Sequence, residues 1–241
     1  MARLFSSGAR PSRFLLVLVG GFLLSGCASE ILFRSSFNQE PVGAPPSPNQ
    51  RVGTTTVTGT PGNVVIVAAP ENPAGGNWVK ISRTPGQGNP ANTMVCHLTP
   101  FRGDGKYSLV AVVFIPKGSG LATVEFATVP LAGQGNFSFF HLDFLETDNL
   151  RINDDSSQVF GSFPRDKMFS LAVTMDITAS SATATVQLLG AASGARESIN
   201  LVRPGFPLSL PRQFGAVKFS MGFNWGGFFD VTEIIVTRKN P

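Results

Sequence analysis

Apolar and polar residues alternate along most of this chain. Residues 169–177 (FSLAVTMDI) are the clearest case, because every odd position carries a large apolar side chain and every even position a small or polar one. A period of two places the apolar side chains on one face of an extended strand, as in a strand that buries one face. No segment after residue 26 sustains helical spacing. The pattern predicts an all-β domain.

Short apolar runs of this kind recur along the chain, and 26 glycines and 18 prolines separate them. Glycine and proline favour turns, so we place turns at residues 117–120, 132–135 and 176–182. A succession of short strands joined by turns is typical of a β-sandwich or a barrel. The predicted strands are residues 31–37, 64–68, 78–82, 107–115, 122–129, 137–144, 169–177, 183–189, 216–221 and 229–237.

The N-terminus has the pattern of a secretion signal. Arg3, Arg10 and Arg13 precede an uncharged apolar run at residues 14–24. This run is too short to cross a bilayer as a helix, because that needs about 20 residues. Residues 24–27 (LSGC) resemble the lipobox of bacterial lipoproteins. That resemblance implies cleavage before Cys27, a diacylglyceryl group on its thiol and an acyl chain such as palmitate on its amine. The alternative is an ordinary signal peptide or a short membrane anchor with a chance cysteine.

This interpretation divides the chain into a signal peptide at residues 1–26, a lipidated tether at 27–30 and a sandwich domain at 31–241. In lipoproteins of Gram-negative bacteria an aspartate after the cysteine commonly retains the protein in the inner membrane. Ala28 therefore favours the outer membrane if the host is Gram-negative. Residues 41–50 (PVGAPPSPNQ) have the composition of a linker, but the apolar residues just before them favour a loop inside the domain.

Charge and cysteine content narrow the classes of function. The chain has 19 basic and 15 acidic residues, and three of the arginines lie in the signal, which leaves 16 and 15. No cluster of basic and aromatic residues indicates nucleic-acid binding. Once Cys27 is acylated, Cys96 is the only cysteine left, so no intramolecular disulfide can form. Its apolar surroundings predict a buried thiol, and one cysteine with two histidines leaves little for a zinc site.

Two segments resemble the first and last strands of concanavalin A-like lectin and glucanase sandwiches. Residues 33–38 (FRSSFN) match the F-x-x-x-F-N-like opening of that fold, and residues 229–237 (FDVTEIIVT) match its apolar closing strand. The chain also resembles uncharacterised exported bacterial proteins of this sandwich type. The resemblance implies a jelly roll whose first and last strands lie near one another, and it implies no activity.

Residues 141–146 (HLDFLE) are the sharpest candidate for catalysis. Laminarinase-type retaining glucanases of this fold carry a strand reading E-x-D-x-x-E, with a nucleophile, a helper and an acid/base in that order. By that resemblance Asp143 matches the helper and Glu146 the acid/base, but His141 stands where the nucleophile should be. A retaining mechanism needs two carboxyl groups about 5–5.5 Å apart. The alternative is an ordinary strand with both carboxylates solvated at its end, and we expect no endoglucanase activity.

Acidic residues between positions 148 and 155 have two interpretations. Asp148, Asp154 and Asp155 offer oxygen ligands for Ca²⁺, and laminin G-like relatives of the sandwich bind Ca²⁺ at loop ends. Clusters of Asn and Asp also form solvated turns, which is the alternative here. A proline-arginine turn at residues 163–167 is interpreted as a surface turn whose Arg165 charge is satisfied locally.

The aromatic residues predict a large core with few sugar platforms, because the chain has 21 Phe but only two Trp and one Tyr. Tryptophan and tyrosine stack on sugar rings and also offer a polar group. Trp225 lies in a Gly-rich turn (residues 223–228) that would present it to solvent, with Asn224 beside it to bind a sugar hydroxyl. The alternative is a Trp packed over the end of the sandwich.

Together these observations predict a membrane-anchored cell-envelope lipoprotein that is not an enzyme and binds glycan or another envelope component. The first alternative is a glycoside hydrolase or lyase that uses Asp143 and Glu146. The second is a purely structural lipoprotein of the envelope. An enzyme needs carboxylates that converge in a cleft, whereas a lectin needs exposed aromatics beside amides.

Overall fold

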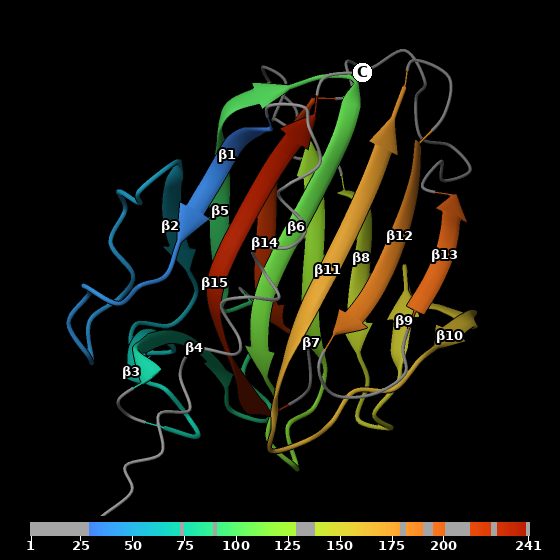
Figure 1. The fold of residues 1–241 in the computed structure, drawn as a ribbon. Helices are drawn as coiled ribbons and strands as arrows, with labels where there is room; N and C mark the ends of the chain where they lie inside the picture. Colours follow the sequence, from blue (N-terminus) through green and yellow to red (C-terminus); the bar gives the residue numbers. More distant parts are fainter. Residues whose placement is uncertain are drawn as a thin grey trace, which may run out of the picture.

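The protein is a sandwich of two antiparallel β-sheets (Figure 1). The computed structural model describes residues 29–72, 75–88, 91–128, 138–178, 182–189, 195–200, 213–222 and 226–239. Within these ranges there is no α-helix, and thus none long and apolar enough to cross a membrane. The predicted all-β sandwich is confirmed.

The front sheet of Figure 1 has the order β13-β12-β11-β6-β15-β4-β3, and β1 also pairs with β15. Its strands follow from the alternation of apolar and polar residues, which gives each one a buried face. Their bounds are β1 Glu30–Ser35, β3 Val64–Ala68, β4 Asn77–Arg83, β6 Gly105–Phe114, β11 Met168–Ile177, β12 Ala182–Leu189, β13 Ala195–Asn200 and β15 Gly227–Lys239.

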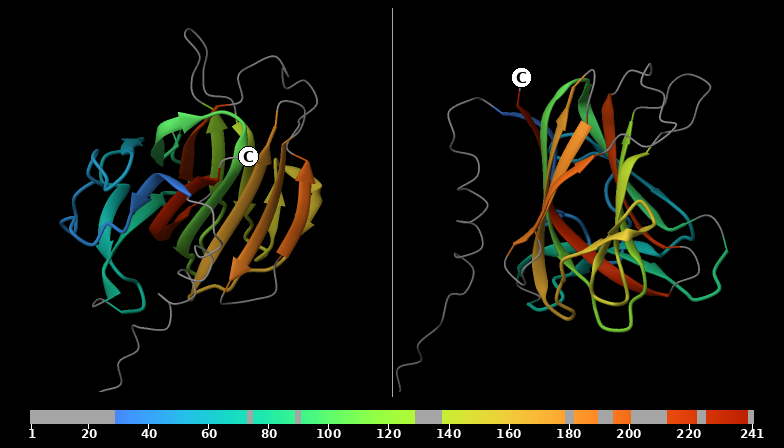
Figure 2. Two further views of the ribbon diagram at one scale, coloured as in Figure 1. Left: turned by 45° about the horizontal axis from the view of Figure 1, so that its top comes forward. Right: turned by 90° about the vertical axis from the view of Figure 1, so that its right-hand side faces the viewer.

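The back sheet has the order β10-β9-β8-β7-β14-β5-β2 and lies against the front sheet, as the edge-on view in Figure 2 shows. Five of the strands in the described ranges, β2, β5, β9, β10 and β13, were not among those predicted. The bounds in the back sheet are β2 Thr54–Thr58, β5 Thr93–Arg102, β7 Ala122–Thr128, β8 Ser138–Phe144, β9 Leu150–Ile152, β10 Asp155–Phe160 and β14 Phe214–Met221.

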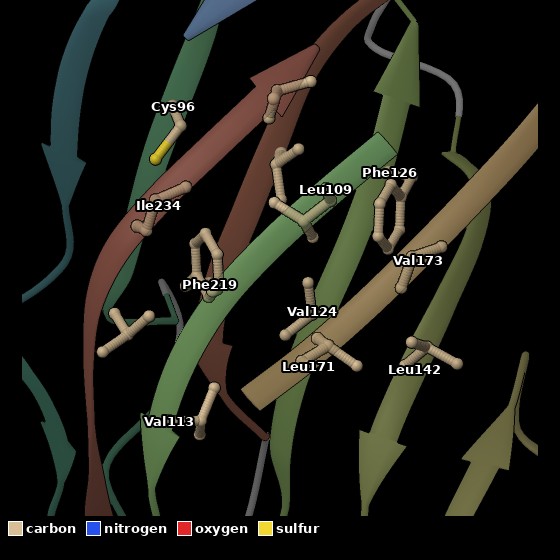
Figure 3. Close-up of a cluster of buried hydrophobic side chains, with 14 of the residues drawn as sticks. Cys96, Leu109, Val113, Val124, Phe126, Leu142, Leu171, Val173, Phe219 and Ile234 are labelled. Atoms are coloured by element: carbon tan, nitrogen blue, oxygen red, sulfur yellow. The ribbon is translucent and has the colours of Figure 1, made fainter. Parts of the chain in front are cut away.

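The hydrophobic core fills the space between the sheets (Figure 3). Phenylalanine dominates its largest side chains, and the rings of Phe126 and Phe140 stack with their centroids 4.4 Å apart. Cys96 points into this core, where burial raises the pKa of its thiol. His97 lies on the opposite face of β5, against the Thr56 hydroxyl. The predicted buried cysteine is found, and the Cys96–His97 neighbours do not meet.

The first and last strands lie side by side, as the jelly-roll resemblance implied. Strand β15 pairs with β4 through its first five residues and with β1 through residues 234–238. Its pairing with β6 shifts register between Thr232 and Ile235, and Glu233 between them has a φ of 48°. A bulge of this kind bends a strand, so one strand can serve two partners on the same edge.

The proline-rich segment 41–50 is a loop inside the domain. It lies between β1 and β2, and the backbone N–H of Gly43 donates to the carbonyl of Ile66 at 2.8 Å. The N–H of Ile66 donates in turn to the carbonyl of Ala44 at 2.7 Å. These bonds give β3 a partner on its outer edge.

The outer faces of the two sheets differ in chemistry. The front sheet carries a small apolar cluster there, built on Trp78 and Phe114 with Asp230 beside them in the strand register. The back sheet carries polar side chains instead, among them His141, Glu125 and Lys218 in one row across three strands. A smaller buried apolar cluster of Val95, Ala127 and Ala216 lies beside these polar side chains on the same face.

Candidate functional site

A pocket opens at one end of the sandwich, where five loops meet. It has a volume of about 800 Å³, within the range of roughly 300–1,000 Å³ that small-ligand sites occupy. The loops connect β4 to β5, β6 to β7, β8 to β9, β10 to β11 and β14 to β15. We call it the end pocket, and it is lined by Pro85, Lys117, Gly118, Ser119, Gly120, Glu146, Thr147, Asp148, Arg165, Gly226 and Gly227.

Arg165 holds three of these loops together. Its Nε donates to Asp148 Oδ1 at 2.6 Å, and its Nη2 donates to the carbonyl of Leu145 at 2.8 Å. Its Nη1 donates to the carbonyls of Pro116 at 3.2 Å and Ser119 at 3.0 Å. Only 6% of the side chain is exposed, so the guanidinium is a structural brace. The turn is at the surface and the Arg165 charge is paired, as the sequence suggested, but the side chain itself is buried.

Glycines allow two walls of the end pocket, the loop from β6 to β7 and the chain that enters β15, to touch. The N–H of Gly120 donates to the carbonyl of Gly226 at 2.9 Å, and the hydroxyl of Ser119 accepts from the N–H of Phe228 at 3.1 Å. A β-carbon on Gly227 would lie 2.6 Å from the Cα of Ser119, and Gly227 also has a φ of 113°. Any other residue there would be strained, so the close contact requires glycine.

The side chains that line the end pocket are mostly polar and carry charges of both signs. Glu146, Thr147 and Lys117 are exposed. Asp148 is about half exposed and shares its charge with Arg165. Pro85 adds an apolar surface. The pocket can therefore bind hydroxyl groups as donors and as acceptors.

A second polar cluster lies on the outer face of the back sheet. His141 and Asp143 are on the same face of β8 because they are two residues apart. Arg151 comes from β9, where the register places it opposite Asp143, and Asp154 comes from the turn that follows β9. We call these four residues the sheet-face cluster.

Hydrogen bonds and ion pairs connect all members of the sheet-face cluster. The buried Asp143 accepts from the Thr123 hydroxyl at 2.9 Å through Oδ1, and from Arg151 Nη2 at 2.9 Å through Oδ2. Arg151 Nη2 also donates to Asp154 Oδ1 at 2.8 Å. His141 Nε2 lies 3.2 Å from Asp154 Oδ2. A single guanidinium thus pairs with both carboxylates.

The structure separates the two residues of the glucanase-like motif. Asp143 is buried in the sheet-face cluster, with both of its oxygens engaged. Glu146 is exposed in the turn after β8 and lines the end pocket. A helper and an acid/base of one active site would have to line the same cleft, and these two residues face different surroundings.

The three candidate calcium ligands also have different partners. Asp148 pairs with Arg165, and Asp154 pairs with Arg151 and His141. Asp155 accepts from the N–H and the hydroxyl of Ser157, which lowers the pKa of its carboxyl. They therefore do not form one oxygen cage of the kind calcium prefers.

Three candidates fall outside the described residues: Cys27, Asn224 and Trp225. The two pocket glycines at positions 226 and 227 belong to the Gly-rich turn that the sequence singled out. The end pocket thus brings together Glu146, Asp148 and this turn, which were separate candidates in the sequence. Lys117 and Arg165 are its new members. Only the proline-arginine turn hinted at Arg165 in the sequence.

No protein-family model matches the chain, and no curated protein does. Its structure is similar to endo-1,3-beta-glucanase from Streptomyces sioyaensis, with a TM-score of 0.55 and 14% identity over 98% of this chain and 100% of that one. For Trypanosoma rangeli sialidase in complex with 2,3-difluorosialic acid, the TM-score is 0.54 and the identity 13%, over 90% of this chain and 31% of that one. The fold is a concanavalin A-like sandwich.

A third similar structure is a carbohydrate esterase from the Shiga toxin-encoding bacteriophage phi24B. Its TM-score is 0.51 and its identity 13%, over 89% of this chain and 100% of that one. The chain spans about a third of the length of the sialidase. Identities this low establish a common fold and nothing about activity.

Proposed function

We propose that this protein is a lipid-anchored protein of the bacterial cell envelope that binds glycan, without catalysis, in its end pocket. The observation that carries the proposal is the set of groups in that pocket. Carboxylates such as Glu146 accept hydrogen bonds from neighbouring sugar hydroxyls, and Lys117 donates to them. Pro85 offers an apolar surface for the C–H face of a sugar ring, and the glycines let a ring approach the backbone.

The rigidity of the pocket supports binding. Arg165 and the contacts between glycines fix its walls before a ligand arrives, which lowers the entropy that binding costs. Three proteins of the same sandwich type carry the names glucanase, sialidase and carbohydrate esterase. Their names agree with a sugar as ligand.

The first prediction concerns the polar groups of the end pocket. Weak binding is expected, with a Kd on the order of 0.1–1 mM, because few groups contact the sugar. Glu146→Gln and Lys117→Ala should each weaken binding at least about tenfold, a loss of about 1.4 kcal/mol each. A glycan array followed by calorimetry on the best oligosaccharide measures this.

Asp155→Asn is the matched control, because Asp155 is an exposed acid at the start of β10 whose side chain accepts hydrogen bonds from Ser157 of the same strand. It should bind as the unmodified protein does. Trp225→Ala should abolish binding with little change in melting temperature if Trp225 is a sugar platform. Hydrolysis of laminarin that disappears in Glu146→Gln would instead favour the glycoside hydrolase. Equal binding by all variants would exclude the end pocket as the glycan-binding site.

The second prediction concerns the anchor. Acylation at Cys27 is the proposed attachment to the membrane, and three acyl chains hold a protein far more firmly than one. The protein should therefore take up a clickable palmitate analogue in cells and partition into the detergent phase. A Cys27→Ala variant that still takes up the label and matures normally would exclude the lipobox.

A further inference from the structure

The sheet-face cluster contains a nearly complete set of metal ligands. His141, Asp143 and Asp154 each offer one ligand atom, and these three atoms lie within 4.8 Å of one another. The atoms are His141 Nε2, which lies 3.6 Å from Asp143 Oδ2 and 3.2 Å from Asp154 Oδ2. They come from β8 and from the turn after β9, so two paired strands fix their positions.

The two separations from His141 Nε2 are close to those of tetrahedral zinc coordination. Zinc lies about 2.0–2.2 Å from its nitrogen and oxygen ligands, which places neighbouring ligand atoms of a tetrahedron about 3.3–3.6 Å apart. The two measured distances from His141 Nε2 lie at the upper end of this range and just below its lower end. We propose that His141, Asp143 and Asp154 form a binding site for a divalent transition-metal ion of the zinc type.

The ligand types favour such an ion over calcium or magnesium. Imidazole suits zinc, copper, iron and nickel, whereas calcium takes six to eight oxygen ligands. Three protein ligands leave one coordination position for water or another molecule, which is the arrangement of an open zinc site. The sequence alone gave little reason to expect it, because Asp154 meets the other two only through the strand register.

Arg151 belongs to the site as a neighbour of the ligands. It holds Asp154 through Oδ1, which leaves Oδ2 toward His141, and it shares Asp143 Oδ2 with the metal. The Thr123 hydroxyl holds the other oxygen of Asp143. Hydrogen bonds of this kind orient ligand carboxylates. The guanidinium charge opposes the metal charge, so the affinity should be moderate.

Calorimetric titration of zinc chloride into the EDTA-treated, full-length protein in detergent tests this site. One ion per chain is expected to bind. His141→Ala and Asp154→Asn should each weaken binding at least about tenfold, because loss of a direct ligand costs no less than loss of a group behind it. Asn accepts the left-handed backbone of Asp154, whose φ is 59°, so Asp154→Asn should keep the turn.

Two matched controls separate this site from accidental binding. His97→Ala removes the other histidine of the chain, which lies on the same sheet face against Thr56. Asp155→Asn removes the neighbouring acid. Both should bind zinc like the unmodified protein. The NMR signals of the His141 imidazole should shift on addition of zinc, and those of His97 should not. Zinc binding that does not saturate at one ion per chain, or that His141→Ala leaves unchanged, would overturn the proposal.

The proposed metal site and the proposed glycan binding can be tested independently of each other. None of the three ligands lines the end pocket, so loss of zinc binding should leave sugar binding intact. A protein that binds zinc but no sugar would keep this inference and contradict the proposed function.

Discussion

Arg165→Met is expected to lower the free energy of unfolding by about 3–5 kcal/mol, because a side chain that is only 6% exposed loses its hydrogen bonds to three backbone carbonyls and to Asp148. The substitution keeps apolar volume over the Phe163 ring, which lies 4.8 Å from the guanidinium carbon. It removes the donors from the carbonyls of Pro116, Ser119 and Leu145. Each such carbonyl costs about 1–3 kcal/mol when buried without a donor. Urea denaturation measures the change.

Arg51→Met is the matched control, because Arg51 is an exposed arginine. It should change stability by no more than about 0.5 kcal/mol. Glycan binding should also fall in Arg165→Met, since the loops that form the end pocket lose their common support. A loss of stability below about 1 kcal/mol would contradict the role of Arg165 as a brace.

The second large effect concerns Asp230, on the outer face of the front sheet. The residue is 2% exposed, and its Oδ1 has no hydrogen-bond partner in the described part of the chain. Lys80 stands opposite it in β4, but the Lys80 ammonium lies over the Phe228 ring, 4.4 Å from the centroid. Burial raises the pKa of Asp230 to about 7, and the charge of Lys80 opposes that rise only in part.

The sign of the pH dependence follows from this raised pKa. Below about pH 4 the folded and the unfolded chain both hold the Asp230 proton, so the group has no effect on stability. Between about pH 4 and pH 7 only the folded chain keeps it, and stability falls as the pH rises. Above pH 7 the loss is complete and reaches about 4 kcal/mol, at about 1.4 kcal/mol for each pKa unit.

Asp230→Asn should therefore match the unmodified protein at pH 4 and exceed its stability by up to about 4 kcal/mol at pH 8. Urea denaturation at pH 4, 6 and 8 measures the difference. Asp104→Asn, at an exposed carboxyl in the turn between β5 and β6, is the control and should change stability little at each pH. An Asp230→Asn variant that is no more stable than the unmodified protein at pH 8 would show that the buried carboxylate does not destabilise the fold.

The sequence predicted most readily the strands whose alternating apolar and polar side chains indicate that one face is buried. Strands β3 and β11 were placed to within one residue, because β11 alternates apolar and polar side chains and β3 is a short unbroken apolar run (VVIVA). Strand β2 (TTTVT) was missed because only Thr55 of its threonines is buried and its pairing with β5 creates the strand. Strand β10 is polar, and Pro100 interrupts the pattern of β5. Pairing partners cannot be deduced from local pattern alone.

Single residues of the two candidate sites could be predicted from the sequence, but their assembly into sites could not. Glu146 and Asp148 stood out as acids near a strand end, and the glycines at positions 226 and 227 as a turn. The local sequence does not indicate that these loops, which are 80 residues apart in the chain, meet in the structure. The order of the strands in the sheets brings them together. In the sheet-face cluster, His141 and Asp143 follow from alternation. Their contact with Asp154 follows from the pairing of β8 with β9.

In the proposed lipid-anchored protein, the pairing of β1 with β15 would set the orientation of the domain on the membrane. Glu30 already pairs with Arg238 near the end of β15. If Cys27 carries the lipid as we propose, only residues 28 and 29 lie between the anchor and β1, so the chain can span at most about 11 Å there. The end pocket lies beside Gly227, at the start of β15. Thirteen residues of strand span about 40 Å. The anchored domain would then stand on the bilayer with its pocket facing away from the lipid, toward the polymers of the surrounding wall or medium.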